Sequence, residues 1–201
     1  RVNREVWRLS GERVEVRDRY RYLGVEVQQQ VSDWQVHVKR LIGKAQARSR
    51  DLTWMCGRDS GIRPRSAATL WKAIVRPILE YASELWCGEI PQALAQKAEA
   101  VQTNFARAIM GLQGQRALTN TFIRAELGLE RLASRWEKLR LGYWRRIQVA
   151  KPDRALVLVE AMRRRQLRWE STTELNWMKR TRELMRERGL EDFWTSPDLC
   201  V

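Results

Sequence analysis

The spacing of the apolar residues changes near residue 32, and this change constrains the fold more than any other feature of the chain. Residues 4–27 alternate between apolar and polar positions, which is typical of short strands with one buried face. From residue 32 onward the apolar residues recur at intervals of three and four, which places them on one face of a helix. The sequence therefore predicts a mainly α protein, with a small antiparallel β-hairpin element confined to the first 30 residues.

The alternating segment contains three short groups of apolar residues. They lie within 6–9, 14–16 and 23–27. A turn at residues 10–12, which read SGE, can join the first two groups. Because three strands of this length do not easily form a sheet by themselves, we expect them to be the edge of a larger structure.

Capping and proline signals mark the ends of the helices. Ser32 is a candidate N-cap, and Gln35 three residues later completes a capping box. Pro64 and Pro91 can each begin a helix, because the first turn does not need their missing N–H groups. Thr119 is a candidate cap for a short helix. The predicted helices cover 33–55, 64–86, 91–112, 119–128, 132–147, 153–168 and 174–188, the last closed by Gly189.

The apolar faces of the first two helices add detail. Pro77 lies inside the apolar stripe of the second helix and must kink or split it. The predicted buried face of the first helix comprises Trp34, Val38, Leu41, Ala45, Leu52 and Met55. Ten Trp residues also require several packed helices, with partners for the indole N–H groups that are buried.

The charge of the chain favours a polyanionic partner. Lys and Arg number 38 against 24 Asp and Glu, which gives a net charge of +14. Arg dominates most basic clusters, and its planar guanidinium both grips phosphate and stacks on bases. No apolar run approaches the roughly 20 residues of a membrane span. We therefore expect nucleic acid, and no membrane, as the partner, in an intracellular, nuclear setting.

Few residues are suited to cofactor chemistry. The three Cys are far apart and the only histidine is His37, which leaves almost no ligands for zinc. We expect no cofactor in this chain. His37 follows Asp33 by one helical turn, so it is either an exposed or capping imidazole or a phosphate contact.

Four segments in a fixed order carry a resemblance to a polymerase family. They are 19–25, which reads RYRYLGV, 70–86, which reads LWKAIVRPILEYASELW, 101–112, which reads VQTNFARAIMGL, and 126–129, which reads ELGL. This set resembles the region downstream of the active site in reverse transcriptases of non-LTR retrotransposons. There a YLG hairpin, the primer grip, precedes a helical thumb. With a weaker match at 184–194, the resemblance covers most of residues 14–195.

The resemblance implies a primer grip (1–30), a helical thumb (31–113) and a basic helical connector (114–201), with fingers and palm upstream in the same polypeptide. The chain begins at Arg1, which suits a fragment. In the family, an Asp-Asp pair upstream of the hairpin holds the catalytic metals. This chain has no Asp-Asp pair. We therefore expect no catalytic residue and no polymerase activity in the chain alone, with Mg²⁺ held in the missing palm.

The first group of candidate binding residues lies in the hairpin. The resemblance carries the primer-grip role onto Tyr22, Leu23 and Gly24. Arg19 and Arg21 beside them are candidate phosphate contacts. The alternative is that Leu23 belongs to the core and that Gly24 forms a bulge.

The second group lies on the outer face of the first helix. Gly43 and Ala47 would leave a low strip that fits the wide, shallow minor groove of an A-like duplex. The alternative is a solvated charged face. The cations that flank the strip at helical spacing are Lys39, Arg40, Lys44 and Arg50.

The third group lies within 135–168, a segment with 11 cations and 3 acids. The interleaved aromatic residues either stack on a single strand or, as we favour, pack in the core. They are Trp136, Tyr143, Trp144 and Trp169. The candidate phosphate contacts are Arg140, Arg145, Arg146, Arg163 and Arg164.

The predicted function is to hold an RNA–DNA primer–template hybrid, or RNA or DNA, beside a catalytic centre that this chain lacks. Two alternatives remain: a stand-alone helical RNA- or DNA-binding module derived from such an element, and a protein-interaction module. Glu80, Tyr81 and Trp86, which the family repeats, are interpreted as packing residues of the thumb.

Overall fold

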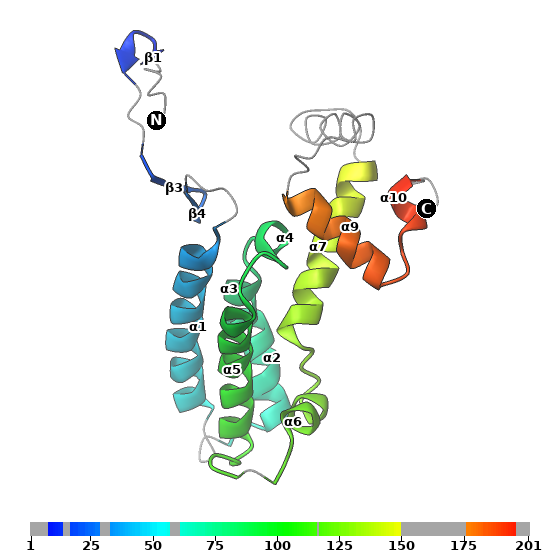
Figure 1. Ribbon diagram of the computed structural model, residues 1–201. Helices are drawn as coiled ribbons and strands as arrows, with labels where there is room; N and C mark the ends of the chain where they lie inside the picture. Colours follow the sequence, from blue (N-terminus) through cyan, green and yellow to red (C-terminus); the bar gives the residue numbers. More distant parts are fainter. Residues whose placement is uncertain are drawn as a thin grey trace.

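A computed structural model shows a mainly helical protein with a small β element near the N-terminus, as the sequence predicted (Figure 1). The helix predicted at 153–168 lies outside the residues that the structure describes. The described residues are 8–13, 17–28, 33–56, 61–115, 117–149 and 176–195.

The described strands form two separate antiparallel hairpins. They are β1 (Arg8–Leu9), β2 (Glu12–Arg13), β3 (Arg19–Tyr22) and β4 (Val25–Gln28). The turn predicted between the first two strands is confirmed, with positive φ at Ser10 and Gly11. Leu23, expected in a strand, instead occupies the turn between β3 and β4. The segment 14–16 is not among the described residues.

Helix α1 (Gln35–Met55) begins close to the predicted position but with a different cap. Trp34 occupies the N-cap position, and the Asp33 Oδ1 accepts the N–H of Gln35 at 3.1 Å. Ser32, the predicted cap, lies outside the described residues. The predicted buried face is confirmed except at Met55, which is exposed in the last turn.

Pro77 splits the second helix, one of the two predicted outcomes. The pieces are α2 (Pro64–Ile74), α3 (Arg76–Glu80) and α4 (Ser83–Trp86). The break between α2 and α3 lies at Val75, two residues before the proline. Ala82 adopts a left-handed conformation with φ of 56° and turns the chain into α4.

The remaining helices begin and end near the predicted signals. The Thr119 Oγ1 accepts the N–H of Phe122 at 3.2 Å, which confirms the cap. Gly128 and Gly189 both have positive φ and follow helix ends, as expected for C-terminal glycines. These helices are α5 (Gln92–Ile109), α6 (Asn120–Glu126), α7 (Leu132–Val149), α9 (Asn176–Glu187) and α10 (Asp192–Thr195).

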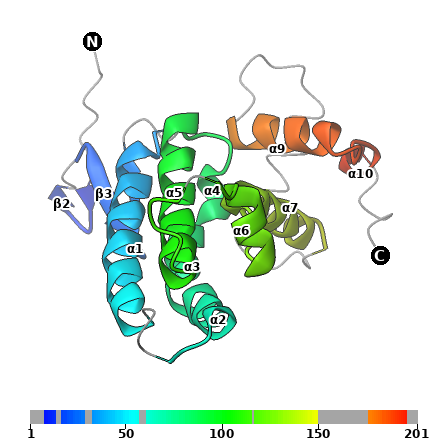
Figure 2. The same cartoon turned by 90° about the horizontal axis from the view of Figure 1, so that it is seen from below.

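Two apolar clusters stabilise the described helices. The larger extends from Trp34 on the N-terminal side of α1 to Trp136 in α7. The smaller joins the second half of α7 to α9 and α10, where Trp144 and Trp194 stack at 5.8 Å. Figures 1 and 2 show α1 and α5 side by side, with α7 leading away to α9. Trp136 and Trp144 are buried, which confirms that they belong to the core.

Candidate nucleic-acid interface

The turn of the β3–β4 hairpin is held by side chains from two helical segments. Leu23 and Gly24 have φ of 47° and 84°, as a two-residue turn with both residues left-handed requires. The Tyr81 hydroxyl donates a hydrogen bond to the Leu23 carbonyl, and Arg40 donates one to the Gly24 carbonyl. A Cβ at residue 24 would lie 3.3 Å from the Tyr81 hydroxyl oxygen. The YLG turn and the EYAS segment of the resemblance therefore meet in space.

A second attachment joins β4 to α1. The Glu26 N–H donates to the His37 Nδ1 at 3.3 Å, and the Glu26 carboxylate lies 3.2 Å from the Arg40 Nε. His37 is buried, so it is neither the exposed imidazole nor the phosphate contact that the sequence suggested. Burial, followed by the charge of Arg40, lowers the pKa of His37. The imidazole accepts a backbone hydrogen bond, which requires its Nδ1 to be unprotonated.

The tip of the hairpin is open to solvent. The Tyr22 and Leu23 side chains are exposed, the latter at 75%, and Gly24 is half-buried. Arg19 and Arg21 are also exposed, with no ion pair in the described part of the chain. The structure therefore excludes Leu23 from the core but leaves its primer-grip role a prediction.

A line of residues runs along the outer side of α1, and we call it the α1 stripe: Lys39, Gly43 and Arg50, which are exposed, and Ala47, which is half-buried. Nothing lies within 4 Å of the position of a Cβ on Gly43, so the stripe is low there. Lys44 is exposed beside it. Among the described residues, the side chains of Lys39, Lys44 and Arg50 form no hydrogen bond or ion pair, whereas the Arg40 side chain contacts the hairpin.

A groove of roughly 600 Å³ lies between α1 and α5, beside the α1 stripe. Gln46 and Arg50 of α1 and Asn104 of α5 contribute polar groups to its lining, as does Gln113 beyond α5. Trp54 lies at its edge and is 86% exposed. Sequence inspection missed Trp54, although it follows Arg50 by four residues and so continues the same face of the helix.

Arg140 is placed in the interior. Its side chain is 1% exposed, and the guanidinium donates to the Cys87 carbonyl, to the Thr181 hydroxyl at 2.8 Å and to the Trp177 carbonyl at 2.6 Å. Glu89 lies 3.4 Å away. Burial lowers the pKa of Arg140. These contacts join α7 to α9 and leave no free edge for a phosphate.

The other candidate cations of α7 are at the surface. Arg146 is exposed, lies 3.8 Å from Glu84 and stands over the Tyr143 ring. Arg145 is also exposed. Arg163 and Arg164 lie outside the described residues.

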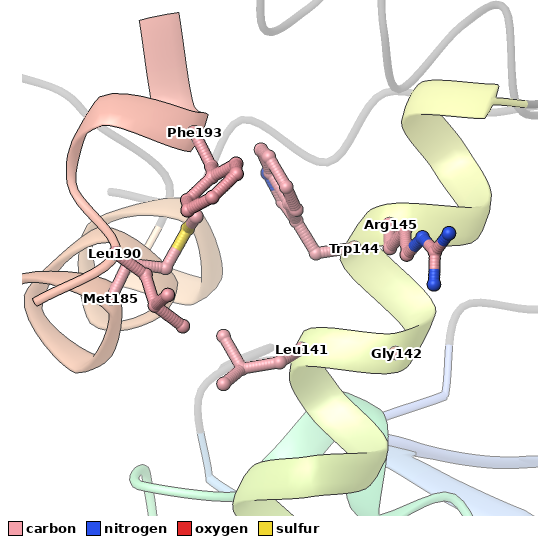
Figure 3. Close-up of a pocket in the computed structure, with 7 residues that line it drawn as sticks. All are labelled: Leu141, Gly142, Trp144, Arg145, Met185, Leu190 and Phe193. Carbon is pink, nitrogen blue, oxygen red and sulfur yellow. The ribbon is translucent and has the colours of Figure 1, made fainter. Parts of the chain in front are cut away.

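Arg145 borders an apolar pocket of about 330 Å³ between α7 and the C-terminal helices. Figure 3 shows the Trp144, Leu190 and Phe193 side chains around this space, while the Arg145 guanidinium points away from it. Because its lining is almost wholly apolar, this pocket does not suit a phosphate. None of its lining residues belongs to the α1 stripe.

Trp86 has the packing role that the sequence suggested, whereas Glu80 forms an ion pair and Tyr81 is partly exposed and holds the hairpin. Trp86 is buried against Trp136, with ring centroids 4.8 Å apart. The Glu80 carboxylate accepts two hydrogen bonds from Arg135, at 2.8 and 3.2 Å.

Within the described ranges, no cluster of three or more His, Cys, Asp or Glu side chains could hold a metal ion. Cys56 and Cys87 are both buried. Burial raises the pKa of Cys87 to about 11, so this thiol is protonated at neutral pH. None of the described helices is both long enough and apolar enough to cross a membrane.

Comparison of the chain with protein-family models, with curated proteins and with solved structures gave no match.

Proposed function

We propose that this chain is a non-catalytic nucleic-acid-binding unit that holds an RNA–DNA hybrid against the hairpin tip and the α1 stripe. In this proposal it serves as the thumb and connector of a reverse transcriptase whose catalytic centre lies upstream. The observation that carries the proposal is the hydrogen bond from Tyr81 to the Leu23 carbonyl. It joins the two most distinctive segments of the resemblance and presents the YLG tip to solvent.

The charges on α1 support the same surface. Lys39, Lys44 and Arg50 are exposed and have no carboxylate partner in the described part of the chain. Cations in this state can neutralise phosphates and release condensed counterions. Gly43 lets a duplex approach the helix closely, as shape recognition of a wide, shallow minor groove requires.

The test is binding of a blunt RNA–DNA hybrid at several salt concentrations. If six phosphates are neutralised, log K should fall against log salt with a slope of about −5, from about −0.9 per contact. Sequence preference should be weak, because contacts to phosphates carry no sequence information. A flat salt response, or no binding at low salt, would contradict the proposal.

Two narrower versions of this proposal make different predictions for the parent reading frame. If the chain is part of a polymerase, the parent frame encodes an Asp-Asp pair upstream of Tyr22. If it is a stand-alone binding module, the hybrid binds equally well and no such pair is present. In both versions the isolated chain should extend no primer, because two metal-bound carboxylates are needed for that step.

A further inference from the structure

The groove between α1 and α5 shares Gly43 and Arg50 with the α1 stripe, but the rest of its lining lies outside the stripe. Gln46, Asn104 and Gln113 each bring an amide to it. All three are exposed and have no hydrogen-bond partner in the described part of the chain. An amide offers both donors and an acceptor, so it can bind the polar edge of any nucleobase.

Trp54 supplies an apolar surface at the edge of this groove. At 86% it is the most exposed of the large hydrophobic residues in the described chain. Indole faces in single-strand binding proteins stack on bases with little sequence preference. The ring lies one helical turn beyond Arg50, the cation of the same groove, and no described lining residue carries a carboxylate.

We propose that this groove binds one unstacked nucleotide of a single strand that adjoins the duplex. The base stacks on Trp54, its polar edge meets the amides of Gln46 and Asn104, and its phosphate contacts Arg50. The groove volume of roughly 600 Å³ lies within the range of about 300–1,000 Å³ typical of small-ligand sites. This inference rests on the proposed function, because it adds a single-strand site to a duplex-binding surface.

The test compares three probes with one another: a single-stranded oligonucleotide, an abasic oligonucleotide of the same length, and a blunt hybrid. Trp54→Ala should weaken binding of the first by roughly five- to 140-fold, which corresponds to the stacking of one base. Trp54→Phe should restore most of the affinity. The abasic probe should bind wild type weakly and should respond little to Trp54→Ala, because it has no base to stack.

Two controls separate the site from general effects. Phe122→Ala removes another exposed aromatic side chain, on α6, and should leave single-strand affinity unchanged. Circular dichroism should show an unchanged fold for Trp54→Ala, since the side chain is largely in solvent. Asn104→Ala should also weaken the single-stranded probe more than the abasic one.

The outcomes distinguish this inference from the proposed function. Equal losses on base-containing and abasic strands, or no loss on either, would overturn the nucleotide site and leave the groove to another ligand class, such as a peptide. If one of these outcomes occurs while the blunt hybrid still binds wild type with a steep salt slope, only the nucleotide site is refuted and the proposed function stands. If the hybrid does not bind at low salt, the proposed function itself fails.

Discussion

Helices α1 and α7 each carry five cations, yet the structure uses the two sets differently. Most α7 cations contact a carboxylate. These pairs are Arg135–Glu80, Lys138–Glu130, Arg140–Glu89 and Arg146–Glu84. Three of the five on α1 have no such partner in the described residues: Lys39, Lys44 and Arg50. The density of cations on a helix therefore does not identify a binding face. A binding face needs cations that are not already paired with a carboxylate of the same chain.

The cations of the two helices also have two different energetic roles. A buried guanidinium is desolvated, so its partners must remain in place. An exposed ammonium stays hydrated until a phosphate replaces its counterions. We therefore expect substitutions on α7 to change stability and substitutions on α1 to change binding.

The largest expected effect is on the α7 side. Arg140→Met should lower the free energy of unfolding by about 3–5 kcal/mol, because it leaves Glu89 buried without its charge partner. Urea denaturation measures the change. Lys138→Met, which breaks an exposed pair, is the matched control and should cost less than about 1 kcal/mol. If the two variants were equally stable, Arg140 would not be the interior link described above.

The next prediction concerns charge on the α1 side. Lys44→Ala should weaken hybrid binding and reduce the salt slope by about one, because one phosphate contact is lost. Lys138→Ala on α7 should leave the slope unchanged. Fluorescence anisotropy across a salt series measures both. If the slopes of log K against log salt were equal for Lys44→Ala and wild type, Lys44 on α1 would not contact a phosphate.

Shape on the same helix can be tested without changing charge. Ala47→Leu should weaken hybrid binding, because it adds bulk where a sugar edge must approach the α1 stripe. The salt slope should remain nearly the same, since no cation is lost. Ala47 is only half-buried, so the fold should persist by circular dichroism. Affinity equal to wild type would mean that the stripe is simply solvated.

A smaller effect is expected at the hairpin. Tyr81→Phe removes the hydroxyl that donates to the Leu23 carbonyl and should cost about 0.5–1.5 kcal/mol of stability. Urea denaturation measures the loss, and faster amide exchange in β3 and β4 would locate it. Tyr20→Phe is the control, because the Tyr20 ring is exposed and no hydrogen bond is recorded for its hydroxyl. Equal stability of the two variants would show that the hydroxyl contributes nothing.

The final effect concerns pH. His37 is the only histidine, and its pKa in the folded protein is lowered from 6.5, first by burial and then by Arg40. As the pH falls, His37 is therefore protonated in the unfolded chain at a higher pH than in the folded chain. Stability should be fully present above about pH 6.5 and should decline below it, by at most about 1.4 kcal/mol per pH unit. Urea midpoints measured from pH 7.5 to pH 5 test this, and His37→Asn should remove the dependence in that range.

Several fold features were predictable because their causes are local. Pro64 stands at the first residue of α2, Thr119 caps α6 through its own side chain, and Gly189 follows α9. The exposed side of α1 also follows from helical spacing. Trp54 could have been found by the same spacing, since it lies four residues after Arg50.

The partners of individual charges could not be predicted, because they come from distant segments. Arg140 is bound by residues 51–53 positions earlier and 37–41 positions later. Tyr81 reaches Leu23 across 58 residues. No local pattern distinguishes these side chains from solvated ones.

By itself, the sequence determined the helical architecture, the positions of most helix ends and a strongly basic surface, because these depend on neighbouring residues and on net charge. Tertiary structure alone decided which cations are paired with carboxylates and which histidine nitrogen accepts a backbone hydrogen bond. The physical reason is that desolvation and pairing depend on groups that only folding brings together.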